Sequence, residues 1–207
     1  SVVDYFNYRV RTQYTSGRLI GSQFDRAVIA ITVNGVNDAP VAANDTNSVS
    51  EGGTVTVTDG SSDIIDDNDT DSDASASLVV SAIRLGNSEG SGTAGTVGSA
   101  LTGTYGQLTL NANGSYTYVA NTSAANALDA GDTVYDYFNY TLSDGTATDT
   151  ATITITVTGV DDDITAVNDY DTATEGFTRS RDAGTSYDID SDDTDPDDPS
   201  SQTITAI

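Results

Sequence analysis

The chain repeats its own sequence at one fixed distance, and this repeat constrains the fold more than any other feature. Ile-Thr-Val-Asn-Gly-Val-Asn-Asp at 31–38 returns as Ile-Thr-Val-Thr-Gly-Val-Asp-Asp at 155–162. The same displacement of 124 residues relates three further pairs of segments: 51–52 with 175–176, 66–73 with 190–197, and 78–83 with 202–207. A constant displacement over four segments indicates a tandem array of one domain type.

This displacement divides the chain into three pieces. Residues 1–38 are predicted to be the C-terminal third of one β-sandwich repeat, 39–162 a complete repeat, and 163–207 the N-terminal third of the next. The two end pieces together lack the equivalent of 84–132, so they cannot complete one repeat between them. We therefore expect an interior window of a longer polypeptide.

The first piece differs from its counterpart in length. Its Tyr-Phe-Asn-Tyr motif at 5–8 returns at 137–140, displaced by 132 residues instead of 124. Eight additional residues are therefore expected between Arg9 and Ile31, in a longer hairpin.

Alternating apolar residues predict β-strands in every piece. Ile153, Ile155 and Val157 alternate with threonine, which places them on one face of a strand. Further strands are predicted over 133–142, 108–110, 116–118, 55–57 and 79–85, and turns at 143–145 and 111–114, whereas 123–130 is the one short helical candidate. About seven or eight short strands in roughly 120 residues predict an all-β fold of tandem immunoglobulin-like β-sandwiches.

The composition is strongly acidic, which argues against binding to polyanions such as nucleic acid. The chain has 32 acidic and seven basic residues and a formal charge of −25, and every basic residue is arginine. Such a charge repels nucleic acid and anionic membranes. We expect neither a membrane span nor a disulfide, since no apolar run is long enough and cysteine is absent. A disordered acidic linker is the alternative, but the alternating strands and eleven tyrosines argue against it.

The acidic residues recur beside each predicted domain boundary, which points to calcium. Ca²⁺ takes six to eight oxygen ligands from carboxylates, amides, carbonyls and water. Ligands from the end of one repeat, the first strand of the next and its acidic loop are expected to converge at each junction. The alternative is a solvated acidic turn in which aspartate serves turn formation. The candidate ligands of the first junction are Asn37, Asp38, Asp45, Glu51, Asp66, Asn68, Asp69, Asp71 and Asp73; those of the second are Asp161, Asp162, Asp169, Glu175, Asp190, Asp192, Asp193, Asp195 and Asp197.

The residue types argue against an enzyme. Histidine and cysteine are both absent, which removes the usual general base, thiol nucleophiles and the common zinc ligands. The carboxylates gather on predicted turns instead of forming an isolated catalytic pair. We therefore expect no catalytic activity.

Several motifs, in this order, resemble a known family. Tyr-Gly-x-Leu-Thr-Leu-Asn-x-Asn-Gly-Ser-Tyr-Thr-Tyr stands at 105–118, followed by an Asp-Ala-Gly-Asp segment within 127–134 and Phe-Asn-Tyr-Thr-Leu-Ser-Asp-Gly at 138–145. This order resembles the VCBS repeat, and Gly-Val-Asn-Asp-Ala-Pro at 35–40 is similar to the junction of cadherin-like repeats in giant bacterial RTX-type surface adhesins. The resemblance implies cadherin-like sandwiches in an extended rod, outside the cell or on the bacterial surface, stiffened by calcium and used in adhesion, biofilm or surface filaments.

Two classes of non-enzymatic function remain open. One is a structural shaft or filament, which repetition favours because it multiplies length. The other is an adhesin module that itself recognises a glycan or a protein. Neighbouring repeats of the same chain are expected partners in either case.

Four of the seven arginines gather near the long hairpin: Arg9, Arg11, Arg18 and Arg26. They could pair with aspartates of their own domain, hold neighbouring copies side by side, or belong to an exposed loop of variable length.

Overall fold

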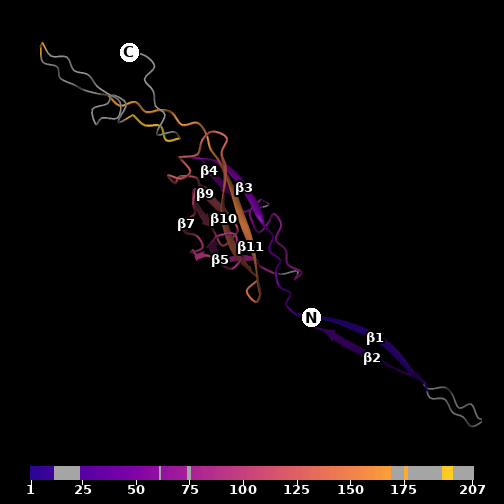
Figure 1. Cartoon of the computed structure of the whole chain (residues 1–207). Helices are drawn as coiled ribbons and strands as arrows, with labels where there is room; N and C mark the ends of the chain where they lie inside the picture. Colours follow the sequence, from indigo (N-terminus) through magenta and orange to yellow (C-terminus); the bar gives the residue numbers. More distant parts are fainter. Residues whose placement is uncertain (12–23, 61, 74–75, 169–174, 177–192, 198–207) are drawn as a thin grey trace, which may run out of the picture. The chain divides into compact units, whose positions relative to one another are not determined.

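The computed structural model describes residues 1–11, 24–60, 62–73, 76–168, 175–176 and 193–197 (Figure 1). The chain divides into two units, 1–38 and 39–207, and each is described by itself. The described residues form eleven strands: β1 Val2–Arg11, β2 Phe24–Val33, β3 Asp45–Ser50, β4 Thr54–Val57, β5 Val79–Leu85, β6 Thr93–Ala94, β7 Ala100–Thr102, β8 Gln107–Leu110, β9 Tyr116–Val119, β10 Thr133–Ser143 and β11 Thr148–Thr158.

The second unit is a β-sandwich, as predicted. One sheet has the order β3-β11-β10-β5-β6 and the other β4-β9-β8-β7. The pairs are antiparallel except for β3, which runs parallel to β11. The hairpins β10–β11 and β8–β9 close at the two turns expected from the sequence.

The core lies between the two sheets and is built from alternate strand positions. Phe138 pairs with Ile153 across β10 and β11, and Tyr140 with Ala151. All four side chains are buried, and Tyr118 of the opposite sheet meets Phe138 edge-on with ring centroids 6.3 Å apart. Burying one such side chain contributes about 1.5–3 kcal/mol, so this face of the central hairpin accounts for much of the stability.

The helical candidate at 123–130 is wrong. The described backbone there forms turns, and no helix occurs among the residues that the structure describes. The Thr122 carbonyl accepts hydrogen bonds from the N–H groups of Ala125 and Asn126, both at 3.1 Å, and the Thr122 hydroxyl caps this single turn. Gly131, at φ 99°, belongs to the turn that leads into β10, so the segment is too short to extend one turn into a helix. Accordingly, no described helix has the length and hydropathy needed to cross a bilayer.

The first unit is a single antiparallel hairpin, β1–β2, with the same register as β10–β11. Phe6 pairs with Ile29 as Phe138 pairs with Ile153. Residues 12–23 separate the paired ends of this hairpin, whereas only 144–147 separate those of β10–β11.

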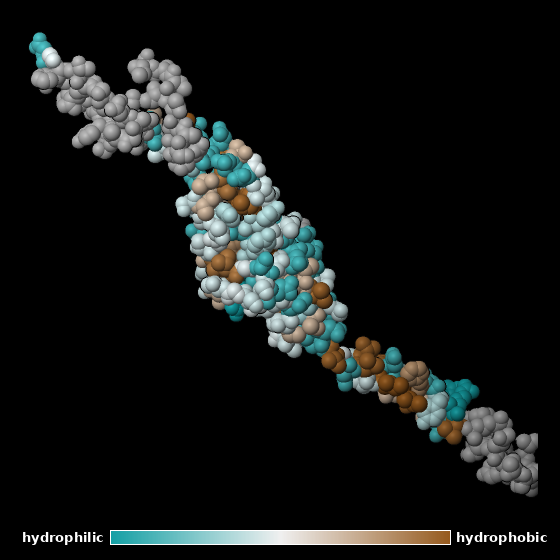
Figure 2. Space-filling model, viewed as in Figure 1, coloured by the Kyte–Doolittle hydropathy of each residue, from teal (hydrophilic) through white to brown (hydrophobic). Residues whose placement is uncertain are grey.

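Apolar side chains on this hairpin are exposed (Figure 2). Phe6 is 53% exposed and Tyr8 45%, whereas their counterparts Phe138 and Tyr140 are fully buried. The hairpin therefore exposes apolar residues at the positions that are buried in β10–β11.

A buried carboxylate ties the two sheets of the sandwich together. Asp136 of β10 is 2% exposed and accepts hydrogen bonds from the backbone N–H groups of Thr104, Tyr105 and Gly106 at 2.8–3.0 Å. The hydroxyl of Tyr118 also donates to it, at 2.7 Å. A Cβ on Gly106 would collide with the Tyr118 ring, so the Tyr-Gly pair of the 105–118 motif permits this close approach.

Replacing Asp136 with alanine should lower the free energy of unfolding by about 3–5 kcal/mol, because four donors lose a buried acceptor. Urea unfolding of the full chain in calcium buffer measures this. Asp163→Asn, an exposed acid, is the matched control and should change stability by less than about 0.5 kcal/mol. Equal, small effects of the two substitutions would show that the Asp136 network contributes little.

Candidate metal sites

Three contacts of the acidic loop occur twice in the structure, displaced by 124 residues. Val41 bridges Thr70, and Thr165 bridges Thr194. The Ala43 N–H donates to Asp69 Oδ1 at 2.7 Å, and the Val167 N–H to Asp193 Oδ1 at 2.6 Å.

The third contact lies within the Asp-x-Asp pair itself. The Asp73 N–H donates to Asp71 Oδ1 at 2.7 Å, and the Asp197 N–H to Asp195 Oδ1 at 3.2 Å. The sequence repeat is therefore also a repeat of local geometry, and the loop holds its aspartates in a defined arrangement.

The first candidate site is the junction cluster, which consists of Glu51, Asp162, Asp195 and Asp197. Glu51 follows β3 in a turn, where its N–H donates to the Thr158 carbonyl at 2.9 Å. The Val160 N–H donates to its Oε1, and its Oε2 is buried without a hydrogen-bond partner. Only 7% of Glu51 is exposed, so this carboxylate is held inside the structure with one oxygen unsatisfied.

Asp197 belongs to the described segment 193–197 and contributes a second unsatisfied oxygen to this cluster. Its Oδ2 accepts a hydrogen bond from the Asp162 N–H at 2.8 Å, whereas its Oδ1 is buried and has no partner. Burial raises the pKa of Glu51, the Val160 N–H lowers it, and the negative charges of Asp162 and Asp197 raise it again. These carboxylates are therefore close enough to repel one another, and a cation among them would remove that repulsion.

The second candidate site is the inner acidic pair, Asp45 and Asp69. Asp45 begins β3 in register with Ile153 of β11 and is 9% exposed. Asp69, from the acidic loop, accepts the Ala43 N–H and the hydroxyl of Tyr140, which lies 3.0 and 2.9 Å from its two oxygens. The Tyr140 hydroxyl also lies 3.0 Å from the Ala43 carbonyl.

The electrostatics of the inner acidic pair are unfavourable at neutral pH. Burial and the charge of Asp69 raise the pKa of Asp45 from 3.8 to about 7, against the hydrogen bond from Tyr140. Burial also raises the pKa of Asp69. No arginine is among the main influences on either group.

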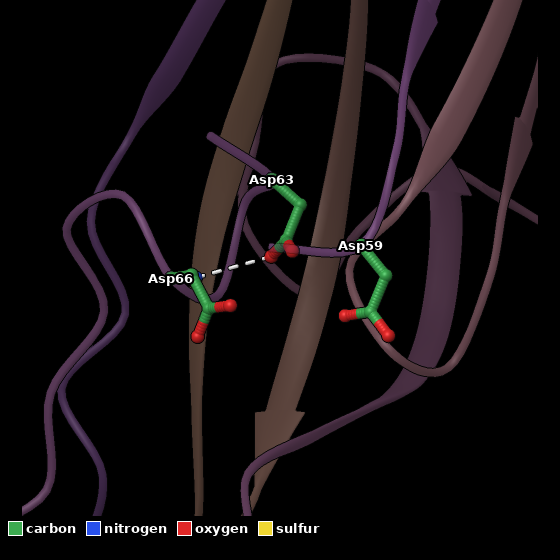
Figure 3. A group of neighbouring side chains, drawn as sticks. All are labelled: Asp59, Asp63 and Asp66. Carbon is green, nitrogen blue, oxygen red and sulfur yellow. Dashed lines mark hydrogen bonds between the residues drawn. The ribbon is translucent and has the colours of Figure 1, made fainter. Parts of the chain in front are cut away.

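A third acidic group, the loop cluster, joins the predicted Asp66 with Asp59 and Asp63, which were not predicted (Figure 3). One carboxylate oxygen of each lies within 4.8 Å of the others. Asp63 is fully buried, but its oxygens accept the N–H groups of Gly60, Ile65 and Asp66 at 2.7–3.1 Å. Because the backbone already satisfies Asp63, we assign this cluster to the turn and not to a metal.

The structure separates two residues that the sequence analysis placed at one junction. Asp45 stands at the first position of β3 and Glu51 directly after its last, so about 20 Å of extended strand lie between them. Glu51 instead shares a cluster with Asp162 and Asp197, which were assigned to the second junction. The reason is the parallel pairing of β3 with β11, which takes Glu51 to the end where β11 leaves the sandwich.

The remaining predicted ligands lie in varied surroundings. Asp71 Oδ2 is buried without a partner, whereas Asp66, Asn68, Asp161 and Glu175 are exposed. The Asn37 amide donates to the Asp38 carbonyl at 2.7 Å within the first unit. Outside the described residues lie Asp169, Asp190 and Asp192, together with Arg18.

One participant escaped sequence reasoning. Tyr140 lies in the strand predicted over 133–142, and its hydroxyl contacts Asp69. Asp136, which joins the two sheets, was not predicted either. It stands on the inward face of β10 between Val134 and Phe138, and an acid at such a position was the signal that could have identified it.

These features define a class of protein: an all-β sandwich that buries carboxylate oxygens without hydrogen-bond partners. The bacterial cadherin-like domain family matches residues 37–159, and the chain belongs to this family. No curated protein matches the sequence.

Solved structures with some likeness include endo-fucoidan hydrolases of glycoside hydrolase family 107. A substituted form of MfFcnA4 has 14% identity and a TM-score of 0.34, over 76% of this chain and 19% of that chain. MfFcnA9 has 13% identity and a TM-score of 0.28, over 73% and 22%. The chain thus spans about a fifth of the length of these enzymes, and likeness at this level carries no inference about activity.

In chelator, the stability of the chain should fall as the pH rises from about 4 to about 7. The folded chain keeps a proton on Asp45 up to its pKa of about 7, whereas the unfolded chain releases it near 3.8. Raising the pH through this window therefore removes up to ~4 kcal/mol, and Asp45→Asn should lack this component. Urea unfolding at several pH values compares the two proteins, and parallel stability curves would contradict the interpretation.

Proposed function

We propose that the chain is a structural segment of a secreted bacterial surface protein, in which calcium locks consecutive cadherin-like repeats into an extended rod for adhesion or biofilm. The observation that supports this most is the pair of unsatisfied buried oxygens, Glu51 Oε2 and Asp197 Oδ1. They come from the complete repeat and from the acidic loop that follows it, so one ion bound by both would join the two.

The chemistry of the junction cluster suits calcium. Its side chains offer only oxygen, which hard cations such as Ca²⁺ prefer over nitrogen or sulfur ligands. Glu51, Asp162, Asp195 and Asp197 can supply carboxylate oxygens, and water can complete the six to eight ligands that the ion takes. If the segment lies outside the cell as proposed, its calcium affinity is expected in the range of extracellular modules, roughly 10⁻⁴–10⁻³ M.

We propose a non-catalytic role for this segment. The chain has neither histidine nor cysteine, and two of its buried carboxylates, Asp63 and Asp136, are engaged by backbone N–H groups. Acids held in this way serve as hydrogen-bond acceptors and not as proton-transfer groups. The repeat therefore contributes length and stiffness.

Calcium should fix the position of the following segment relative to the sandwich. The chain has no native cysteine, so spin labels at Ser123→Cys and Asn168→Cys, both exposed positions, would be specific. Double electron–electron resonance should give a narrow distance distribution with calcium and a broad one with chelator. Glu51→Gln should stay broad in calcium, because it removes one charged ligand at nearly constant shape.

Asp163→Asn is the control for this measurement and should behave as the parent does. Equal widths with calcium and with chelator in the parent chain would contradict the proposed junction.

We also propose that the hairpin of the first unit binds a neighbouring copy. Arg9 and Arg26 are directly paired across β1 and β2, and both are exposed. Two adjacent guanidinium groups repel each other and gain from contact with carboxylates, which abound on a chain of charge −25.

Replacing both Arg9 and Arg26 with serine should reduce self-association at low salt, since it removes the two paired positive charges. Sedimentation velocity at increasing protein concentration measures this. Association that is equally strong in the variant, or insensitive to salt, would contradict an electrostatic lateral contact.

A further inference from the structure

The inner acidic pair carries an inference that is independent of the junction. Asp45 occupies an inward-facing position of β3, on the face that also carries Val49, which packs against the core. An apolar residue is expected at such a position. Asp45 is instead nine-tenths buried, and its Oδ2 has no hydrogen-bond partner. Burying an ionised carboxylate in this way is costly unless a positive charge joins it.

Acceptors outnumber donors around this pair. The Tyr140 hydroxyl has one hydrogen, yet the Ala43 carbonyl and both oxygens of Asp69 lie within 3.0 Å of it. The Ala43 N–H serves only Asp69 Oδ1. The two donors therefore face three oxygens, from Asp69 and the Ala43 carbonyl, and Asp45 Oδ2 is left without a donor.

We infer that Asp45 and Asp69 bind a divalent cation inside each repeat, separate from the ion at the junction cluster. The Asp45 and Asp69 carboxylates would be the charged ligands, and the Ala43 carbonyl and Tyr140 hydroxyl oxygens neutral ones. All are oxygens, which favours a hard ion of the size of Ca²⁺ that completes its shell with water. Asp69 is half-buried, so the ion reaches the pair from the side of the acidic loop.

Neighbouring charges strengthen this site. The carboxylates of Asp67 and Asp63 act on Asp45, and that of Asp149 acts on Asp69. Negative charges around a pair that already repels itself raise its affinity for a cation. Asp149 also accepts the Ala42 N–H at 2.9 Å, which holds the segment before β3 against the start of β11.

One contact of this pair recurs 124 residues further along the chain. Asp69 has its counterpart in Asp193, which accepts the N–H of Val167 as Asp69 accepts that of Ala43. The sequence counterpart of Asp45 is Asp169, which lies outside the described residues. The Asp69 contact is therefore not a feature of one irregular loop.

This inference goes beyond the proposed function, because the inner site needs no neighbouring repeat. Asp45 and Glu51 lie at opposite ends of β3, about 20 Å apart along the strand, so one ion cannot serve both. Calcium would then stabilise the sandwich as well as its junction.

Calcium titration of the full chain by isothermal calorimetry, after removal of metal, tests the inference. Asp45→Asn and Asp69→Asn should each bind one calcium ion fewer than the parent, and Asp45→Asn combined with Glu51→Gln should lose the ions of both sites. Tyr140→Phe retains both carboxylates but removes a neutral ligand, so it should lower the calcium affinity of the inner site. Asp163→Asn, as the exposed control, should match the parent.

Two outcomes separate this inference from the proposed function. If Asp45→Asn and Asp69→Asn bind as many ions as the parent with unchanged affinity, a proton neutralises the pair and the inner site is wrong. If only Glu51→Gln leaves the number unchanged, the junction proposal fails and the inner site stands. Circular dichroism checks that each variant folds. If Asp45→Asn does not fold, the number of ions bound by Asp69→Asn tests the inner site.

Discussion

Buried carboxylate oxygens without a donor are the constraint on which the rest of this structure depends. Glu51, Asp45, Asp71 and Asp197 each bury one oxygen that has no hydrogen-bond partner. The main influences on the pKa values of Glu51 and Asp45 are burial and other carboxylates, with no arginine among them. A sandwich that holds acids in this way gains stability at neutral pH when protons or cations neutralise them, and calcium is the cation that we propose for these oxygens.

The sandwich determines where these oxygens meet. β3 runs parallel to β11 and carries Asp45 at its beginning, while Glu51 follows its end. One strand thus serves two places: an acidic pair beside the entering chain and an acidic cluster beside the departing chain. Asp136 shows the contrasting case, because four donors satisfy its carboxylate and it needs no cation.

The strands and the core could be predicted from the sequence, because alternation alone assigns faces to them. Ile153, Ile155 and Val157 are buried as expected, and the turn at 143–145 closes the hairpin. The grouping of ligands could not be predicted, since it depends on strand direction: Asp45 and Glu51 are neighbours in sequence but lie apart along an extended strand. The sequence also did not show which carboxylates have hydrogen-bond donors. Asp63 and Asp136 are satisfied by backbone N–H groups, whereas Asp71 keeps one buried oxygen without a donor, and only the structure distinguishes them.

The most direct test of the account is an anomalous difference map from crystals of the full chain grown with calcium. The account predicts a peak about 2.3–2.6 Å from both Glu51 Oε2 and Asp197 Oδ1, the distance at which oxygen binds Ca²⁺. Well-ordered density for Glu51 and Asp197 with no anomalous peak between them, at saturating calcium, would contradict it.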